Sequence, residues 1–214
     1  MAHPSNREPV VVMPDTCQAD CRHTHSGPPG CSGGTALYLR RSGYPRPVGM
    51  EFIGCRLSSA EWRAVLDDPS TVDALLYGDV DDDDAEMPEP ELDLGKSWHA
   101  LHYLLTGTAW DTGAGTAGAA ILGGDEIGND GGYGPARVLD PDLVRTVATA
   151  LDAVDPETLN ARFDADAMAA AQIYPNVWTR GATDVNDFSA DFAELRRFYR
   201  AAADNGQAVL LAIT

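Results

Sequence analysis

LDLGKSWHALHYLLTG, residues 92–107, predicts a short extended segment followed by a helix. Gly95 ends the extended segment, and Gly107 stands where a glycine commonly closes a helix. Four large apolar side chains recur between these glycines at helical spacing: Trp98, Leu101, Leu104 and Leu105. The pattern therefore predicts an amphipathic helix that packs on the rest of the domain through this face.

Two histidines lie one turn apart on the predicted helix. His99 and His102 could offer two imidazoles to one metal ion, proton or substrate. The sequence places no third ligand nearby, which weakens a metal site. We therefore favour another interpretation, in which His102 packs at the edge of the core with one ring nitrogen hydrogen-bonded, and His99 lies at the surface.

The chain has 214 residues and a net charge of −18, which is unevenly distributed. Residues 1–49 carry a charge of +2, whereas residues 50–214 hold 10 basic and 30 acidic side chains. A surface this acidic repels nucleic acid and anionic membranes and suits a basic protein partner. The alternative is that the charge serves solubility alone.

The first 49 residues differ from the remainder in composition. They are rich in Pro, Gly, Ser and Arg with little periodicity, so we expect a disordered extension or a mis-assigned start, and a folded domain over residues 50–214. This extension holds residue types that suit zinc, at a spacing unlike that of a familiar zinc finger. The candidate ligands are Cys17, Cys21, His23, His25 and Cys31.

No apolar run reaches membrane-spanning length, and the N-terminus lacks the pattern of a signal peptide. We therefore expect a cytoplasmic protein without structural disulfides. The sequence also lacks a cofactor fingerprint, and we expect no cofactor.

Strand patterns occur near both ends of the domain. Residues 51–57 form a plausible strand, and residues 208–213 are a fully apolar run that predicts a central strand covered on both faces. Helical patterns fill most of the chain between them. This order does not alternate as in a doubly wound fold, so we predict an α+β fold, in which six or seven helices pack on a small mixed or antiparallel sheet that unites the termini of the domain.

A glycine-rich stretch covers residues 123–137. It lacks the Gly-Lys-Ser/Thr ending of a phosphate-binding loop and the dinucleotide pattern, so we read it as a long turn into a strand at residues 137–139. If a pocket opens here, Tyr133 and Arg137 are well placed to line it.

Four segments of residues 50–214 carry a resemblance to a known family. They are Phe52-Ile53-Gly54, the stretch Leu92–Gly107, Ile173-Tyr174-Pro175 and Ala208-Val209-Leu210-Leu211. In these segments the chain resembles the YfbM-like family, a bacterial domain of unknown function. The family pattern has Asp where this chain has Gly95. The resemblance implies a fold and no reaction.

Three functions are compatible with these features. We place a protein-interaction domain first, because no nucleophile–base–acid set is recognisable. The second is an enzyme or ligand site in which His102 is the general acid/base and Arg137 and Lys96 hold an anionic substrate, with Tyr133 as a further catalytic candidate. Additional ligand-binding candidates are Asp93, Trp98, His99 and Tyr174. The third is zinc binding by the N-terminal Cys/His cluster.

Overall fold

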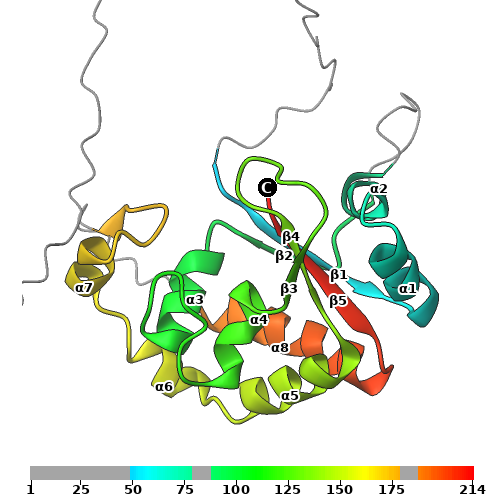
Figure 1. Cartoon of the computed structure of the whole chain (residues 1–214). Coiled ribbons are helices and arrows are strands. Elements are labelled where there is room, and N and C mark those ends of the chain that lie inside the picture. The colour runs from blue at the N-terminus through cyan, green and yellow to red at the C-terminus, as the bar shows by residue number, and fades with distance from the viewer. Residues whose placement is uncertain (1–48, 79–87, 179–187) are drawn as a thin grey trace, which may run out of the picture. The chain divides into compact units, whose positions relative to one another are not determined.

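The computed structural model describes residues 49–78, 88–178 and 188–214. Five strands form one sheet in the order β2-β1-β5-β4-β3, and every neighbouring pair is antiparallel (Figure 1). The strands are β1 (Phe52–Leu57), β2 (Leu92–Gly95), β3 (Asp125–Ile127), β4 (Ala136–Leu139) and β5 (Ala208–Ile213).

The last strand, β5, lies at the centre of the sheet. It pairs with β1 along its whole length, from Phe52↔Ile213 to Leu57↔Ala208, and with β4 on its other side. A strand buried on both faces needs apolar residues at every position, which explains the unbroken run AVLLAI. The sheet thus unites the two ends of the domain, as the sequence predicted.

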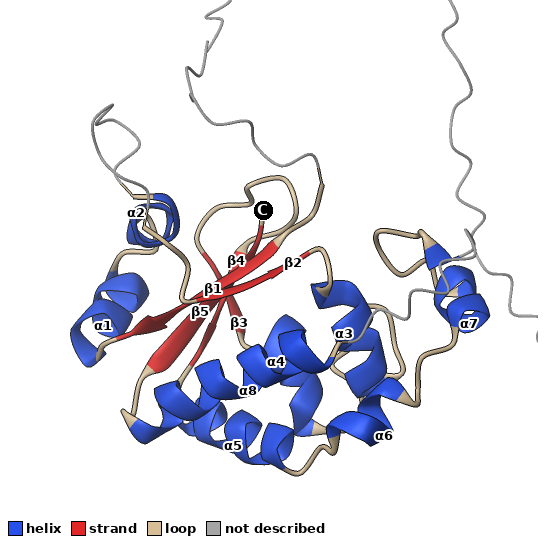
Figure 2. Ribbon diagram, turned by 180° about the vertical axis from the view of Figure 1, so that it is seen from behind, coloured by secondary structure: helices blue, strands red, loops and turns tan. Residues whose placement is uncertain are grey.

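Eight α-helices and one 3₁₀ turn, η1, pack around this sheet within the described residues. They are α1 (Ser59–Asp67), α2 (Thr71–Tyr77), α3 (Trp98–Thr106), η1 (Thr116–Gly118), α4 (Ala119–Leu122), α5 (Pro141–Asp152), α6 (Pro156–Asn160), α7 (Ala165–Ala170) and α8 (Ser189–Asp204). Helices α1 and α2 cover one face of the sheet, while α3, α4, α5 and α8 lie against the other (Figure 2).

The two faces bury cores of unequal size. The larger core joins Phe52, Val209 and Leu211 of the sheet to side chains of α3, α5 and α8. The smaller core joins Ala208 and Leu210 to α1 and α2. Alternate residues of β5 therefore serve opposite cores, as the period-2 geometry of a strand requires.

Local sequence sets the ends of several helices. Ser58 and Glu61 form a reciprocal capping box at α1, and the carboxylate of Asp140 caps α5 ahead of Pro141. Gly107 ends α3 with φ +74°, a left-handed conformation that glycine adopts without steric cost.

The predicted α+β class with an antiparallel sheet is confirmed, and two details differ. Short helices raise the number of α-helices above the predicted six or seven. Residues 123–137 are not one long turn, because Asp125–Ile127 forms the edge strand β3 opposite β4. A strand of three residues with two exposed side chains gives almost no hydrophobic alternation by which to recognise it.

No helix within the described ranges is long and apolar enough to cross a membrane. The N-terminal extension, apart from Gly49, lies outside those ranges, so its predicted disorder stays a prediction.

Candidate functional site

His99, on the first turn of α3, is completely buried, so the expectation that it lies at the surface was wrong. Its Nδ1 accepts a hydrogen bond from the backbone N–H of Tyr174 at 3.0 Å. Because Nδ1 accepts, Nε2 carries the proton and donates to the carbonyl of Ala109 at 2.8 Å. Burial lowers the pKa of His99, which keeps the ring neutral.

His102, one turn further along α3, is also completely buried. Its Nε2 donates to the carbonyl of Asp111 at 3.0 Å, whereas Nδ1 has no hydrogen-bond partner among the described residues. Burial lowers the pKa of His102 to about 4. The predicted core histidine with one hydrogen-bonded ring nitrogen is thus confirmed.

The two histidines hold the carbonyls on either side of Trp110. His99 bonds residue 109 and His102 bonds residue 111, so the helical spacing of the histidines sets the backbone of the loop between them. The Trp110 ring contacts the His99 ring at an interplanar angle of 47°, with centroids 4.5 Å apart, yet Trp110 remains 60% exposed. The Trp110 loop, residues 107–118, therefore exposes a large aromatic side chain to solvent, while buried histidines hold the backbone on both sides of it.

A second loop, the Tyr133 loop of residues 128–135, is organised by one carboxylate. Asp130 Oδ1 accepts from the backbone N–H groups of Gly132 at 2.7 Å and of Gly134 at 3.0 Å. Both glycines have positive φ, +114° and +96°, which side chains disfavour. Tyr133 stands between them and is 49% exposed.

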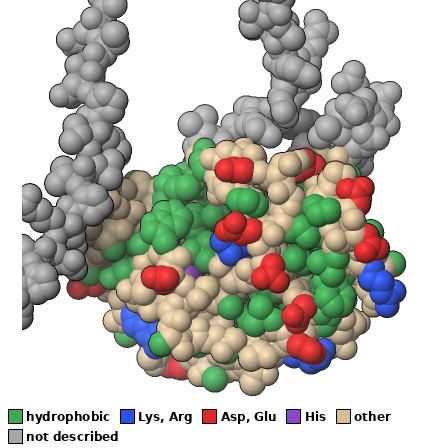
Figure 3. Space-filling model, in the orientation of Figure 1, with side chains coloured by type: hydrophobic (Ala, Val, Ile, Leu, Met, Phe, Trp, Pro, Cys, Tyr) green, Lys and Arg blue, Asp and Glu red, His purple; other side chains and the backbone are tan. Residues whose placement is uncertain are grey.

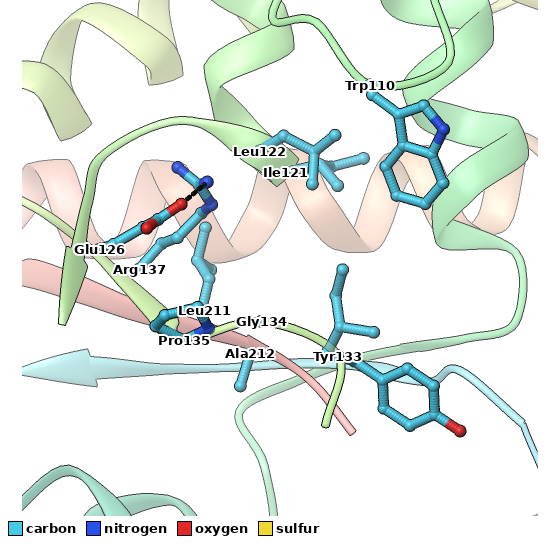
Figure 4. Close-up of a pocket in the computed structure, with 11 residues that line it drawn as sticks. Trp110, Ile121, Leu122, Glu126, Tyr133, Gly134, Pro135, Arg137, Leu211 and Ala212 are labelled. Carbon is cyan, nitrogen blue, oxygen red and sulfur yellow. Dashed lines mark hydrogen bonds and ion pairs between the residues drawn. The ribbon is translucent and has the colours of Figure 1, made fainter. Parts of the chain in front are cut away.

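The two loops meet at a hollow of about 160 Å³ at one end of the sheet (Figure 4). In this view Trp110 comes from the loop at the top, Tyr133 lies below it, and an Arg137–Glu126 pair lies on the other side. Leu122 of α4 contributes partly exposed apolar surface, and the almost fully buried Leu211 of β5 also lines the hollow. The remaining lining residues are Ile121, Gly134, Pro135, Ala212 and Ile213.

Arg137 of β4 faces Glu126 of β3 because the two residues are paired across the hairpin. Its Nη2 lies 2.7 Å from Glu126 Oε1, and its Nη1 donates to the carbonyl of Gly124 at 3.3 Å. The side chain of Arg137 is 30% exposed and that of Glu126 is 59% exposed. The carboxylate is therefore the more accessible charge of the pair.

Three further candidates, Asp93, Lys96 and Tyr174, do not line the hollow. The backbone N–H of Gly95 donates to Asp93 Oδ1, which shapes the turn before α3. A Cβ placed on Gly49 would collide with the Tyr174 hydroxyl and lie 3.1 Å from Cε of Lys96. Tyr174 and Lys96 therefore pack closely around Gly49, where the described chain begins.

Trp98 lies in the same region as these residues, but inside the core. Its indole Nε1 donates to the carbonyl of Met50 at 3.4 Å, and its ring stacks on His99 with centroids 4.6 Å apart. Trp98 is completely buried and is not accessible to a ligand.

The candidate residues therefore divide into separate groups. Tyr133 and Arg137 share the hollow as the sequence anticipated, whereas His102 is enclosed beneath the Trp110 loop and lines no part of it. The sequence interpretation missed Trp110 and Glu126. Trp110 could have been found as a tryptophan in a polar, glycine-rich loop. Glu126 could not, because the sequence pattern of strand β3 is too weak to recognise.

Within the described ranges, no group of three His, Cys, Asp or Glu side chains is placed to hold a metal ion. The candidate zinc ligands Cys17, Cys21, His23, His25 and Cys31 lie outside those ranges.

Acidic side chains outnumber basic ones on the face seen in Figure 3, where they lie among hydrophobic side chains. On the segments around the hollow, Asp111, Asp125 and Asp130 are all exposed. The segments that border the hollow therefore carry exposed negative charge.

Comparison with known proteins supports the fold and gives no activity. A solved structure described as a protein of unknown function, YfbM from Escherichia coli, matches with a TM-score of 0.59 and 19% sequence identity, covering 78% of this chain and 100% of that one. No curated protein matches the chain. Residues 48–212 match a family described as a domain of unknown function, DUF1877, and the chain belongs to this family.

Proposed function

We propose that this domain binds a protein partner at the hollow between Trp110 and Tyr133. The observation that carries the proposal is an exposed Trp110 whose flanking carbonyls are both hydrogen-bonded by buried histidines. Tryptophan, tyrosine and arginine are the side chains that most often dominate binding energy at protein interfaces. A side chain already held in place loses little conformational entropy on binding.

The size of the hollow favours a protein over a small molecule. Its volume of about 160 Å³ is below the roughly 300 Å³ at which pockets for drug-sized ligands begin. Two of the three exposed large hydrophobic side chains described, Trp110 and Tyr133, stand at its edge. This arrangement suits one inserted side chain with further contacts at the rim.

The charge of the domain indicates the character of the partner. Residues 50–214 carry a net charge of −20, which attracts a basic protein. Such a charge accelerates association more than it strengthens the final complex. We place this encounter in the bacterial cytoplasm, the compartment that the sequence favours.

The test compares two truncations of exposed hydrophobic side chains. Trp110→Ala removes the proposed anchor, and Leu66→Ala on α1 is the control, because Leu66 is 52% exposed and does not line the hollow. Partners retained from the native cell are identified, purified and titrated against each variant. We expect Trp110→Ala to weaken binding at least about thirtyfold and Leu66→Ala to leave it unchanged.

Equal affinity of the wild-type protein and Trp110→Ala for every purified partner would reject the proposal. A partner lost equally in both variants would point to a general effect of surface hydrophobicity instead.

A small anionic ligand is the second candidate, because Tyr133 and Arg137 line the same hollow. In this alternative Arg137 would exchange Glu126 for the ligand. The enclosed position of His102 speaks against its acting there as general acid/base. Arg137→Gln would then abolish binding of the anion, whereas a protein site centred on Trp110 would keep most of its affinity.

A further inference from the structure

The most exposed charged side chains at and around the hollow are all negative. Glu126 is 59% exposed, and Asp111, Asp125 and Asp130 are exposed on the neighbouring segments. The basic side chain among the lining residues is Arg137, which is 30% exposed and already bonded to Glu126 and to the Gly124 carbonyl. An anion would have to displace Glu126 and approach the exposed carboxylates on the neighbouring segments. A cation can approach the more exposed Glu126 carboxylate, while the charge of the less exposed Arg137 is already paired with Glu126.

The aromatic side chains add to this preference. The Trp110 ring contacts the ring of His99 at an interplanar angle of 47°, and the Trp110 side chain remains 60% exposed. The face of an indole attracts a cation through its quadrupole, more strongly than the faces of Tyr or Phe do. Tyr133 provides a second exposed ring at the same hollow.

The remaining lining is apolar. Leu122 and Pro135 line the hollow and are partly exposed, so they contribute hydrocarbon surface beside the aromatic side chains and the Arg137–Glu126 pair. A surface that is apolar along its length and negative at its edge complements a side chain with an alkyl stem and a cationic end.

We infer that the hollow receives a lysine or arginine side chain of the partner, with its alkyl stem on the apolar lining and its charge toward Glu126 and the exposed aromatic rings. This inference rests on the proposed function and specifies the residue type that the partner must offer.

The experiment uses amino-acid amides as probes on the full chain. N-acetyl-lysine amide and N-acetyl-arginine amide carry the charge, N-acetyl-norleucine amide keeps the stem without it, and N-acetyl-glutamate amide reverses it. Binding is followed by the NMR signal of the Trp110 indole N–H, which Trp110→Phe identifies among the chain's four tryptophans. We expect the cationic amides to bind about twofold to fivefold more tightly than the norleucine amide.

Two variants that each remove one carboxylate separate the attraction of Glu126 for a cation from the attraction of the whole acidic surface. Glu126→Gln removes the carboxylate at the hollow while keeping its shape, and Glu157→Gln removes an exposed carboxylate of α6 that does not line the hollow. We expect Glu126→Gln to weaken cation binding about twofold to fivefold and Glu157→Gln to have little effect. Equal binding of the norleucine amide, tighter binding of the glutamate amide, or equal effects of the two variants would overturn the inference.

The outcomes also separate this inference from the proposed function. If a purified partner requires Trp110 but the cationic amides bind no better than norleucine, the protein-binding function stands and the inference fails. If the cationic amides bind at Glu126 and no partner requires Trp110, the preference for a cation stands and the protein-binding function fails.

Discussion

The Trp110 loop and the Tyr133 loop bring exposed aromatic side chains to the same hollow, but they are held in different ways. Buried neutral histidines bond the carbonyls on both sides of Trp110, and Thr108 Oγ1 adds a second bond to the Asp111 carbonyl at 2.6 Å. The Tyr133 loop instead depends on the exposed carboxylate of Asp130. A core anchor gives a side chain one position, whereas a bond open to solvent lets a loop adapt.

This difference implies that the two loops would contribute to binding in different ways. A fixed Trp110 would supply an anchor that loses little entropy on binding, while an adaptable Tyr133 loop would adjust to the shape of the partner. Substitutions in each loop should therefore have unequal effects on stability.

The largest effect is expected from His99→Ala, which removes the anchor of the Trp110 loop. The change opens a cavity between Trp98 and Trp110 and leaves the Tyr174 N–H and the Ala109 carbonyl without their partner. We expect a loss of roughly 3–5 kcal/mol in the free energy of unfolding, measured by urea denaturation.

The same substitution made in a Trp110→Ala background tests the contact between the rings. In this background the loss of unfolding free energy caused by His99→Ala should be smaller by about 0.5–1.5 kcal/mol, the range for a pair of aromatic rings in contact. A loss below about 1 kcal/mol for His99→Ala alone would show that His99 does not anchor the loop.

The second effect is a loss of stability in mild acid. Burial lowers the pKa of His102 to about 4, below its ordinary value of 6.5, so the folded state binds fewer protons than the unfolded state between these values. The contribution of His102 is complete above pH 6.5 and is lost as the pH falls toward 4. We expect this loss to be roughly 3 kcal/mol.

His102→Gln is the matched control for this pH dependence. A glutamine amide can donate to the Asp111 carbonyl and does not titrate, so the variant should lose roughly 3 kcal/mol less than the wild-type protein over the same range. Hydrogen bonds at helix caps lower the pKa of Glu61 and Asp155, and their stabilisation is lost mainly at more acidic pH. Identical profiles in the two proteins would contradict the role given to His102.

An intermediate effect should distinguish glycines of the two loops. A Cβ on Gly118 would collide with the carbonyl oxygen of Thr112 and lie 2.5 Å from Thr106 Cγ2, so Gly118→Ala should cost roughly 1–3 kcal/mol. A Cβ on Gly131 meets no described atom within 4 Å, so Gly131→Ala should be neutral or stabilise by up to about 1 kcal/mol. Equal thermal unfolding of these variants would remove the distinction between the loops.

The smallest effect on stability is expected from Asp130→Ala. It removes two exposed hydrogen bonds and should change the free energy of unfolding by less than about 1 kcal/mol. NMR relaxation of the Tyr133 loop should nevertheless show increased motion, while that of the Trp110 loop stays unchanged. Increased motion in both loops would show that they are coupled.

Regular elements of this fold could be predicted because each leaves a local pattern. The unbroken apolar run of β5 identifies a central strand, the Ser58–Glu61 box starts α1, and Gly107 ends α3. Each signal depends on backbone geometry within a few residues. The edge strand β3 leaves no such pattern, because its hydrogen bonds to β4 define it rather than its own side chains.

The candidate site could be predicted only in part. Tyr133 and Arg137 were recognisable from a glycine-rich segment, but the accompanying Glu126 depends on the register of the β3–β4 hairpin. Trp110 was recognisable as a large aromatic residue in a loop, but its exposure depends on the hydrogen bonds that hold its neighbours.

The sequence by itself determined the α+β class, the central C-terminal strand and several helix ends, because periodicity and capping act over short distances. Only the tertiary structure decided the role of the two histidines. Their spacing predicted a packed His102 with one hydrogen-bonded nitrogen, but it did not predict the burial of His99 or the loop that both histidines bind. The role of the histidines depends on which segment packs over α3. In this structure the segment is the Trp110 loop, and the histidines donate the hydrogen bonds that the carbonyls of Ala109 and Asp111 need.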